Sequence, residues 1–168
     1  LVNARKKDST GICFVGNKGY TQFIEENVSK SRLHRGLLKR YPDGEVLAEH
    51  DGIHGFTLGQ RKGLGVAVGD PQYVLKIEPE TNTVWVGDEK YLYQDKMQIQ
   101  NTHWLDDVKD GERLRIKVRF HHPGTWGVLT KNEKGATVAF DEPVRAITPG
   151  QAAVMYRENQ LVGGGWIL

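Results

Sequence analysis

Short runs of β-branched and aromatic residues recur along most of this 168-residue chain and are separated by turn-forming residues. Residues 73–77 and 83–86 form two such runs, and the Pro- and Asn-containing loop between them predicts a hairpin. Further runs lie in the second half of the chain at residues 113–120, 126–130, 136–140 and 152–156. Short strands at this spacing are typical of a small barrel, so we expect a mainly β fold.

One segment has the periodicity of a helix instead. Residues 20–28 place Tyr20, Phe23, Ile24 and Val28 on a single helical face. We expect three parts along the chain: residues 1–18 as an entry segment, residues 19–88 as a central domain, and residues 95–168 as a β-rich C-terminal domain. Because the first residue is Leu1 rather than Met, we expect the chain to be a fragment of a longer protein.

The composition excludes several classes of protein. Hydrophobic residues make up 38% of the chain, which is enough for a real core. The mean hydropathy is −0.53, and no apolar run approaches the roughly 20 residues that a bilayer span requires. We therefore expect no membrane association, and the lone cysteine favours the cytoplasm over a secreted disulfide scaffold. The net charge of +2 is too small to identify a nucleic-acid partner by itself.

Cys13 is the only cysteine, and it lies in a glycine-bounded segment just after the basic triplet at residues 5–7. Nearby positive charge favours the thiolate, which would suit a nucleophile, a sulfur carrier or half of a bridge to another chain. Its apolar neighbours support a different interpretation, in which the cysteine is a small buried hydrophobe. Spacing provides no partner residue, so both interpretations stay open.

The segment at residues 113–120 alternates between apolar and basic residues. As a strand, it would direct one set of side chains to the core and the other set outward. The apolar set is Leu114, Ile116, Val118 and Phe120, and the basic set is Arg113, Arg115, Lys117 and Arg119. Like charges in register repel unless acidic neighbours or phosphates pair with them. We favour phosphate contact over a merely solvated face, and the following His121 and His122 add groups that suit RNA.

Two more basic concentrations occur earlier in the chain. The first comprises Lys30, Arg32, His34, Arg35, Lys39 and Arg40. The second is Arg61 and Lys62, which glycines flank on both sides, so that a loop could bring these cations close to a phosphate. Neither segment matches a nucleotide motif: Val68 stands where a dinucleotide fingerprint needs its third glycine, and there is no Gly-Lys-Ser/Thr loop. The sequence thus predicts no ATP site and no bound cofactor in this chain.

The histidines form no recognised metal motif. His50 and His54 have zincin spacing, but Asp51 replaces the required Glu and glycines interrupt the helix that the motif needs. His121 and His122 are adjacent on an expected strand and should point to opposite sides. We therefore expect no metal site.

Five segments in order along the chain carry a family resemblance: residues 7–16, 57–66, 140–143, 147–152 and 163–167. Together they resemble the bacterial tRNA-specific 2-thiouridylases, over the central and C-terminal domains only. The resemblance implies a small central β-roll followed by a six-stranded β-barrel like the second domain of elongation factors. It also implies that ATP and Mg belong to an N-terminal ATP-pyrophosphatase domain that the chain lacks, so the chain alone should be inactive.

The same resemblance assigns roles to individual residues. The family adenylates the C2 oxygen of the wobble uridine and replaces it with sulfur from a protein persulfide, and Cys13 matches the cysteine that carries this persulfide. Arg119, Phe120 and Gln151 match positions that contact tRNA, although Phe120 stands where the family has Tyr and so lacks the hydroxyl. On charge, we add to the predicted tRNA-binding residues Arg61, Lys62, Arg115 and Lys117. The implied partners are tRNA and a sulfur-donor relay protein, and we expect a monomer.

Two other functions fit the residues. A non-catalytic RNA-binding β module would use the same basic strand, and Cys13 would then be structural. A thiol hydrolase would need Cys13 within hydrogen-bond reach of His34, His50 or His54.

Overall fold

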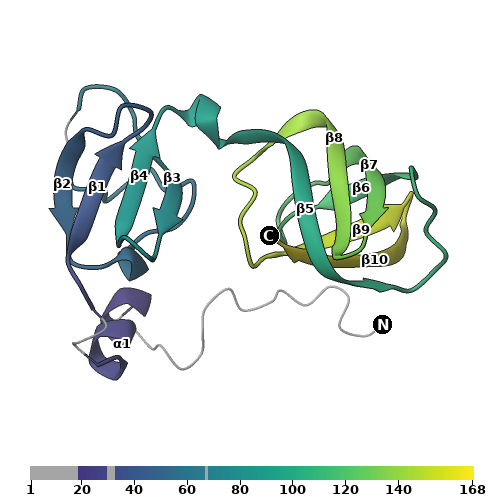
Figure 1. Cartoon of the computed structure of the whole chain (residues 1–168), viewed down its shortest axis with the longest axis horizontal. Helices are drawn as coiled ribbons and strands as arrows, with labels where there is room; N and C mark the ends of the chain where they lie inside the picture. Colours follow the sequence, from purple (N-terminus) through teal and green to yellow (C-terminus); the bar gives the residue numbers. More distant parts are fainter. Residues whose placement is uncertain (1–18, 30–32, 67) are drawn as a thin grey trace.

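The computed structural model describes residues 19–29, 33–66 and 68–168. In these residues a four-stranded sheet and a closed six-stranded barrel lie side by side, joined through the short helical turn η4 (Glu89–Leu92) (Figure 1). The predicted mainly β fold, with one short helix and a six-stranded barrel, is confirmed.

The sheet has the strand order β2-β1-β4-β3. Its strands are β1 (Gly36–Arg40), β2 (Val46–His50), β3 (Tyr73–Glu78) and β4 (Thr83–Gly87). β1 pairs in parallel with β4, whereas the other pairs are antiparallel. The predicted β3–β4 hairpin is confirmed. Asn82, the last residue of the loop between these two strands, has a φ of 49°. Leu38, Val74 and Val84 are fully buried and form the centre of a small core.

Neither β1 nor β2 was among the strands named from the sequence, which marked residues 30–40 as a basic concentration and considered His50 only as part of a metal-like spacing or as a partner of Cys13. Gly36 shows why the backbone matters here: a Cβ atom on it would lie 1.8 Å from the Asn82 carbonyl oxygen. Only glycine therefore allows β1 to pass this close to the end of the hairpin loop. The Asn82 side chain also donates a 2.6 Å hydrogen bond to the His34 carbonyl oxygen, which fixes the entry to β1.

The predicted helix is α1 (Tyr20–Asn27), which ends one residue before the predicted limit, at a Val28 with extended backbone. None of its residues is buried, and Tyr20 is exposed. The helix packs beside the short 3-10 helix η3 (Ile53–Gly55), where His54 Nε2 lies 3.4 Å from Glu25 Oε1. The predicted apolar face of α1 is therefore present, but the described residues bury it only in part.

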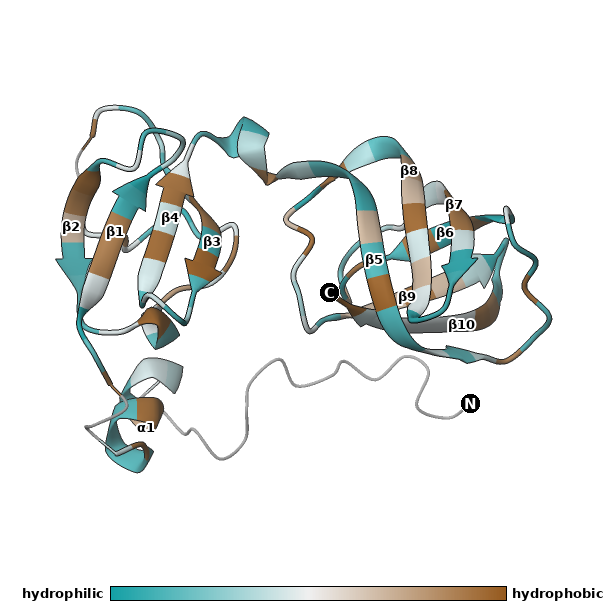
Figure 2. Cartoon of the chain, viewed as in Figure 1, coloured by the Kyte–Doolittle hydropathy of each residue, from teal (hydrophilic) through white to brown (hydrophobic). Residues whose placement is uncertain are grey.

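The barrel closes in the order β10-β5-β8-β7-β6-β9, and every neighbouring pair is antiparallel. Its strands are β5 (Tyr93–Trp104), β6 (Arg113–Lys117), β7 (Thr125–Asn132), β8 (Gly135–Arg145), β9 (Ala152–Arg157) and β10 (Gln160–Ile167). Apolar and polar residues alternate along these strands (Figure 2). The apolar set fills the barrel, with Leu114, Ile116 and Met155 fully buried.

The last strand, β10, contains three consecutive glycines. A Cβ atom on Gly163 would lie 2.4 Å from the His103 carbonyl oxygen of β5, and one on Gly164 would lie 2.2 Å from the Ala153 carbonyl oxygen of β9. Side chains at these positions would push the neighbouring strands away. The glycines thus allow β10 to close the barrel.

The basic segment at residues 113–120 forms a shorter strand than predicted. β6 ends at Lys117, and the chain then turns, with the His122 amide donating to the Arg119 carbonyl oxygen at 3.0 Å. Val118 is still buried, as predicted. The placement of Phe120 in the core was wrong: it follows the end of the strand, lies in the turn, and is 72% exposed.

Candidate RNA-binding surface

One end of the barrel collects several of the predicted RNA-binding residues. Lys117 at the end of β6 pairs with Val154 near the start of β9, and Arg145 at the end of β8 pairs with Tyr93 at the start of β5. Residues that follow β6 and residues that precede β9 therefore share this end of the barrel. These segments carry the turn at residues 119–122 and Gln151, which is exposed.

The turn at residues 119–122 presents an aromatic ring beside a cation. The exposed Phe120 ring makes an edge contact with His121, with 4.7 Å between the ring centroids. Arg119 Nη1 donates to the Arg145 carbonyl oxygen at 3.0 Å, which orients the guanidinium without neutralising it. An exposed ring next to an oriented guanidinium can stack on a base and bind the adjoining phosphate.

His122 closes the turn from within. Its Nδ1 accepts a 3.2 Å hydrogen bond from the Gly124 amide. Burial lowers the pKa of His122, and the positive charges of Arg119 and Lys117 lower it further. These effects favour the neutral form of the ring.

The cations along β6 differ in how they are compensated. Arg113 pairs with Asp141 at 2.6 Å and lies 4.7 Å from the centroid of the Trp126 ring, so its charge is already balanced. Arg115 lies 5.8 Å from the Tyr156 ring centroid, and its buried Nε has no hydrogen-bond partner in the described part of the chain. The four predicted cations therefore do not form one uniform basic face.

Gly124 crosses over the side chains of β6 after the turn. A Cβ atom there would lie 3.0 Å from Arg115 Cγ and 3.4 Å from Lys117 Cγ, and its φ is 94°. The chain thus packs on the aliphatic stems of Arg115 and Lys117. This contact holds both side chains against the barrel.

The second surface is the loop that carries Arg61 and Lys62. Both side chains are exposed. The Gln60 side chain braces the loop, because its Oε1 accepts from the Thr57 amide and its Nε2 donates to the Lys62 carbonyl oxygen, both at 2.9 Å. Backbone hydrogen bonds to Val74 at 2.8 and 2.9 Å attach the loop to β3. The cations therefore stand on a braced loop.

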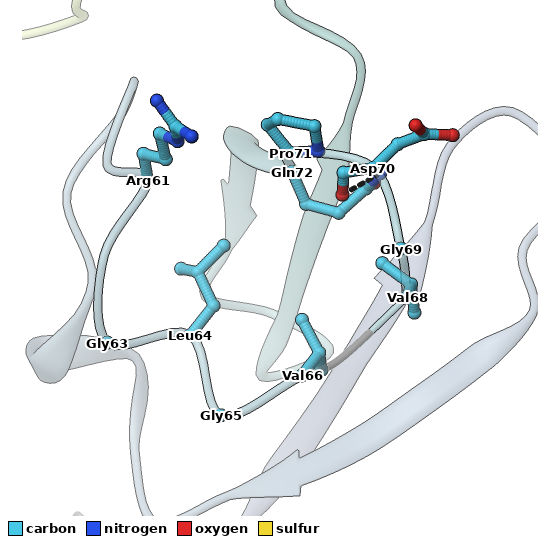
Figure 3. A pocket seen from close by; sticks show the side chains of 10 residues that line it. All are labelled: Arg61, Gly63, Leu64, Gly65, Val66, Val68, Gly69, Asp70, Pro71 and Gln72. Carbon is cyan, nitrogen blue, oxygen red and sulfur yellow. Dashed lines mark hydrogen bonds between the residues drawn. The ribbon is translucent and has the colours of Figure 1, made fainter.

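A hollow of about 590 Å³ opens next to this loop. Arg61 lies on one side of it, with Pro71 and Gln72 on another and Leu64 below (Figure 3). Gly63 and Gly65 have φ values of 74° and 71°, a conformation that favours glycine. Their turns leave the hollow open beside the Arg61 side chain.

The arginines and lysines of the chain differ in whether a carboxylate balances their charge. Arg40, Arg113, Arg145 and Arg157 each lie within 4.0 Å of a carboxylate. In the described part of the chain, no ion pair involves the five cations that were predicted to bind tRNA: Arg61, Lys62, Arg115, Lys117 and Arg119. Of these five, Arg61, Lys62 and Arg119 are also exposed and thus available to an anionic ligand, whereas Arg115 and Lys117 are partly buried.

Two family models match the chain: the tRNA methyl transferase PRC-barrel domain over residues 21–88 and the Aminomethyltransferase beta-barrel domain over residues 94–167. The tRNA-specific 2-thiouridylase MnmA of Aquifex aeolicus is 39% identical over 165 residues, covering 98% of this chain and 45% of that protein. The same enzyme of Acidobacterium capsulatum is 38% identical, covering 100% of this chain and 48% of that protein. The chain belongs to the tRNA 2-thiouridylase family.

The chain comprises the middle and C-terminal β domains of this family. It spans about half the length of the curated relatives it matches: 48% of the Acidobacterium capsulatum enzyme, 45% of the Aquifex aeolicus enzyme and 44% of the Wolbachia pipientis wMel enzyme. The predicted family resemblance is therefore confirmed. Cys13, the residue that the resemblance makes a sulfur carrier, lies outside the described residues, as do Lys30 and Arg32.

One of the described histidines, His50, has a structural environment. His50 is buried, accepts a 3.1 Å hydrogen bond from the Gly52 amide, and packs edge-on against Phe56. Burial lowers its pKa. Within the described ranges, no group of three or more His, Cys, Asp or Glu side chains could hold a metal ion, and no helix there is long and apolar enough to cross a membrane.

Sequence reasoning missed three residues that shape the candidate RNA-binding surface: Gly124, Arg145 and Tyr156. Gly124 and Tyr156 act through Arg115, and Arg145 acts through Arg119. The sequence marks only Gly124, as a glycine that follows His122-Pro123. It does not mark Arg145 and Tyr156, because their contacts join distant parts of the chain.

Proposed function

We propose that this chain is the tRNA-holding and sulfur-carrying part of a tRNA 2-thiouridylase. Residues 1–18 would supply Cys13, residues 19–88 the Arg61–Lys62 loop, and residues 95–168 the barrel with its RNA-binding turn. Membership of the family supports tRNA as the substrate. The positions of the cations that no carboxylate balances support the proposed tRNA-binding surface.

The observation that carries the RNA-binding part is the turn with Arg119 and Phe120. The Phe120 ring is 72% exposed, so its face is accessible for stacking on a base. Its neighbour is a guanidinium that is held by a backbone oxygen and paired with no carboxylate in the described residues. Gln151 at the same end of the barrel adds an amide that can hydrogen-bond to RNA. The combination suits single-stranded or looped RNA better than a protein partner.

The sulfur chemistry in this proposal uses two thiols. A donor protein's persulfide transfers its terminal sulfur to the Cys13 thiolate, which leaves the donor as a thiol and Cys13 as a persulfide. An ATP-pyrophosphatase domain outside this chain adenylates the C2 oxygen of the wobble uridine. The persulfide then attacks C2, the C2–O bond breaks and AMP leaves.

The remaining bond joins the transferred sulfur to Cys13. A second thiol has to attack the Cys13 sulfur, which releases the thiolated base and leaves a disulfide. Because Cys13 is the only cysteine of the chain, this second thiol belongs to another domain or protein. A reductant must then cleave the disulfide before the next cycle.

Substitution Cys13→Ser tests the proposal in a full-length enzyme that contains this chain. We expect 2-thiouridine, measured by mass spectrometry of digested tRNA, to disappear while tRNA affinity changes by no more than about threefold, because a thiol adds little to phosphate binding. Normal thiolation by the variant would refute the sulfur-carrier role. It would favour the alternative, a non-catalytic RNA-binding module with a structural cysteine.

A further inference from the structure

Arg145 lies where three parts of the molecule meet. Its carbonyl oxygen accepts from Arg119 in the RNA-binding turn at 3.0 Å. Its Nε donates to Glu89 Oε1 in η4 at 2.8 Å, and its guanidinium carbon lies 5.5 Å from the centroid of the Tyr73 ring in β3. One residue thus contacts the turn, the connection between the domains, and the sheet.

The Arg61–Lys62 loop packs on the same residue. A Cβ atom on Gly59 would lie 3.4 Å from Arg145 Nη1 and 3.3 Å from Ala146 Cβ. Gly59 also has a φ of 79°, so glycine meets both the spatial and the conformational requirement. The Ala146 amide donates to the Leu92 carbonyl oxygen at 2.9 Å, which attaches this junction to η4.

We propose that Arg145 is a positioning residue that holds the Arg119–Phe120 turn and the Arg61–Lys62 loop at a fixed spacing, so that one RNA molecule contacts both. This inference rests on the proposed tRNA-binding function. When two binding surfaces are fixed relative to each other, the second contact forms at a high effective concentration. A flexible junction would lose that advantage.

The shape of the arginine side chain suits this role. Its planar guanidinium lies near the Tyr73 ring while Nε donates to Glu89, a combination that the point charge of a lysine cannot reproduce. A direct phosphate ligand, in contrast, would gain affinity if Glu89 no longer competed for the guanidinium. Arg145 is also already paired with a carboxylate, unlike Arg119 and Arg61.

The first test measures the spacing without RNA. In a Cys13→Ser background, spin labels on Glu80→Cys and Glu133→Cys, both exposed turn residues, report the distance between sheet and barrel. We expect one narrow distance distribution in the parent and a clearly broader one in Arg145→Ala. The substitution leaves the backbone oxygen that accepts from Arg119, so only the side-chain contacts are lost. An unchanged distribution would overturn the inference.

The second test measures affinity for a tRNA transcript with uridine at the wobble position. We expect Arg145→Ala and Arg145→Lys each to weaken binding by about fivefold or more, which is the low end of coupling between sites. Glu89→Gln should also weaken binding, although it removes a negative charge. Asp141→Asn is the matched control, because it frees Arg113 by the same charge change without touching the junction.

The outcomes separate the possible roles. If Arg145→Lys binds like the parent and Glu89→Gln binds more tightly, Arg145 is a phosphate ligand and the positioning role is wrong. If the parent does not bind tRNA at all, the proposed function fails and the RNA part of the inference fails with it. The distance measurement then still decides whether Arg145 sets the spacing of the domains.

Discussion

The barrel and the sheet expose their cations in structurally different ways. In the barrel every strand is paired on both sides. Arg119 lies on a turn outside this strand pairing. In the sheet, β3 is an edge strand, and the loop with Arg61 and Lys62 hydrogen-bonds to Val74 of that strand. The loop therefore protects a sheet edge and presents cations at the same time. We therefore expect the proposed RNA binding to be separable from folding in the barrel and linked to it in the sheet.

The largest expected effect concerns barrel closure. Gly164→Val should destabilise the barrel by about 3 kcal/mol or more, because its Cβ would lie 2.2 Å from the Ala153 carbonyl oxygen, in backbone that cannot move aside. Chemical unfolding followed by Trp fluorescence and by NMR of sheet residues measures the two parts separately. Gly111→Ala is the control: its φ is 77°, but nothing lies within 4 Å of the added atom, so the loss should stay near 1 kcal/mol. Equal losses in both variants would contradict the account of β10.

The next effect tests whether the barrel cations are separable from folding. Replacing Arg115, Lys117 and Arg119 together with Ala should weaken tRNA binding and lower the slope of log affinity against log salt by roughly 0.7 to 0.9 per lost contact. The melting temperature should fall only slightly, because Arg115 and Lys117 lie opposite the buried Leu114 and Ile116 and lose mainly the packing of their stems under Gly124. Arg119 lies in the exposed turn and adds little to folding.

Arg113→Ala serves as the control for charge on the same strand, because Asp141 already balances Arg113. Its salt slope should match that of the parent. A triple variant with an unaltered slope would show that this face is only solvated, and RNA contact would then rest on Arg61 and Lys62.

A smaller effect tests the linkage in the sheet. Gln60→Ala removes two side-chain hydrogen bonds of the loop, and we expect a loss of about 1 to 2 kcal/mol in the stability of the sheet together with weaker tRNA binding. Gln151→Ala in the barrel should weaken tRNA binding and leave stability unchanged. Denaturant titration and filter binding of both variants provide the comparison. If Gln60→Ala binds tRNA normally at reduced stability, bracing of the loop is unimportant for RNA.

The smallest effect concerns pH. Burial lowers the pKa of both His122 in the barrel and His50 in the sheet below the ordinary value of 6.5. A lowered folded-state pKa stabilises the fold fully above the unfolded value, and this contribution is lost as the pH falls through the folded-state pKa. Both parts should therefore lose stability on acidification.

RNA should distinguish the two rings. A phosphate near Arg119 would favour the charged form of His122 and raise its pKa, whereas the pKa of His50 should stay the same. NMR titration of the imidazole protons with and without tRNA measures both values. Equal behaviour of the two histidines would place the RNA away from the turn.

The sequence predicted those elements whose signal is local. The alternation of Leu114 and Ile116 with basic residues identified β6, and the β3–β4 hairpin was readable from its strands and loop. The apolar face of α1 was equally readable from its period. Phe120 was misplaced because strand alternation says nothing about where the strand ends, and here a turn bond from His122 to Arg119 ends it.

Other features depend on distant partners. β10 was not predicted as a strand, because glycines weaken an isolated strand and become favourable only between β5 and β9. Arg145 carried no signal either, since its carboxylate partner Glu89 is 56 positions away. The candidate RNA-binding residues were named from charge and resemblance, but their grouping at one end of the barrel required the strand register.

The glycine-rich β10 also has a consequence for biosynthesis. Because β10 fills the gap between β5 and β9, both of those strands keep an unpaired edge until the final eight residues of the barrel, Gln160–Ile167, have left the ribosome. The sheet, in contrast, is complete at Gly87 and can form while the barrel is still being translated. A ribosome that stalls late in the message would therefore release a folded sheet attached to an open, aggregation-prone half-barrel.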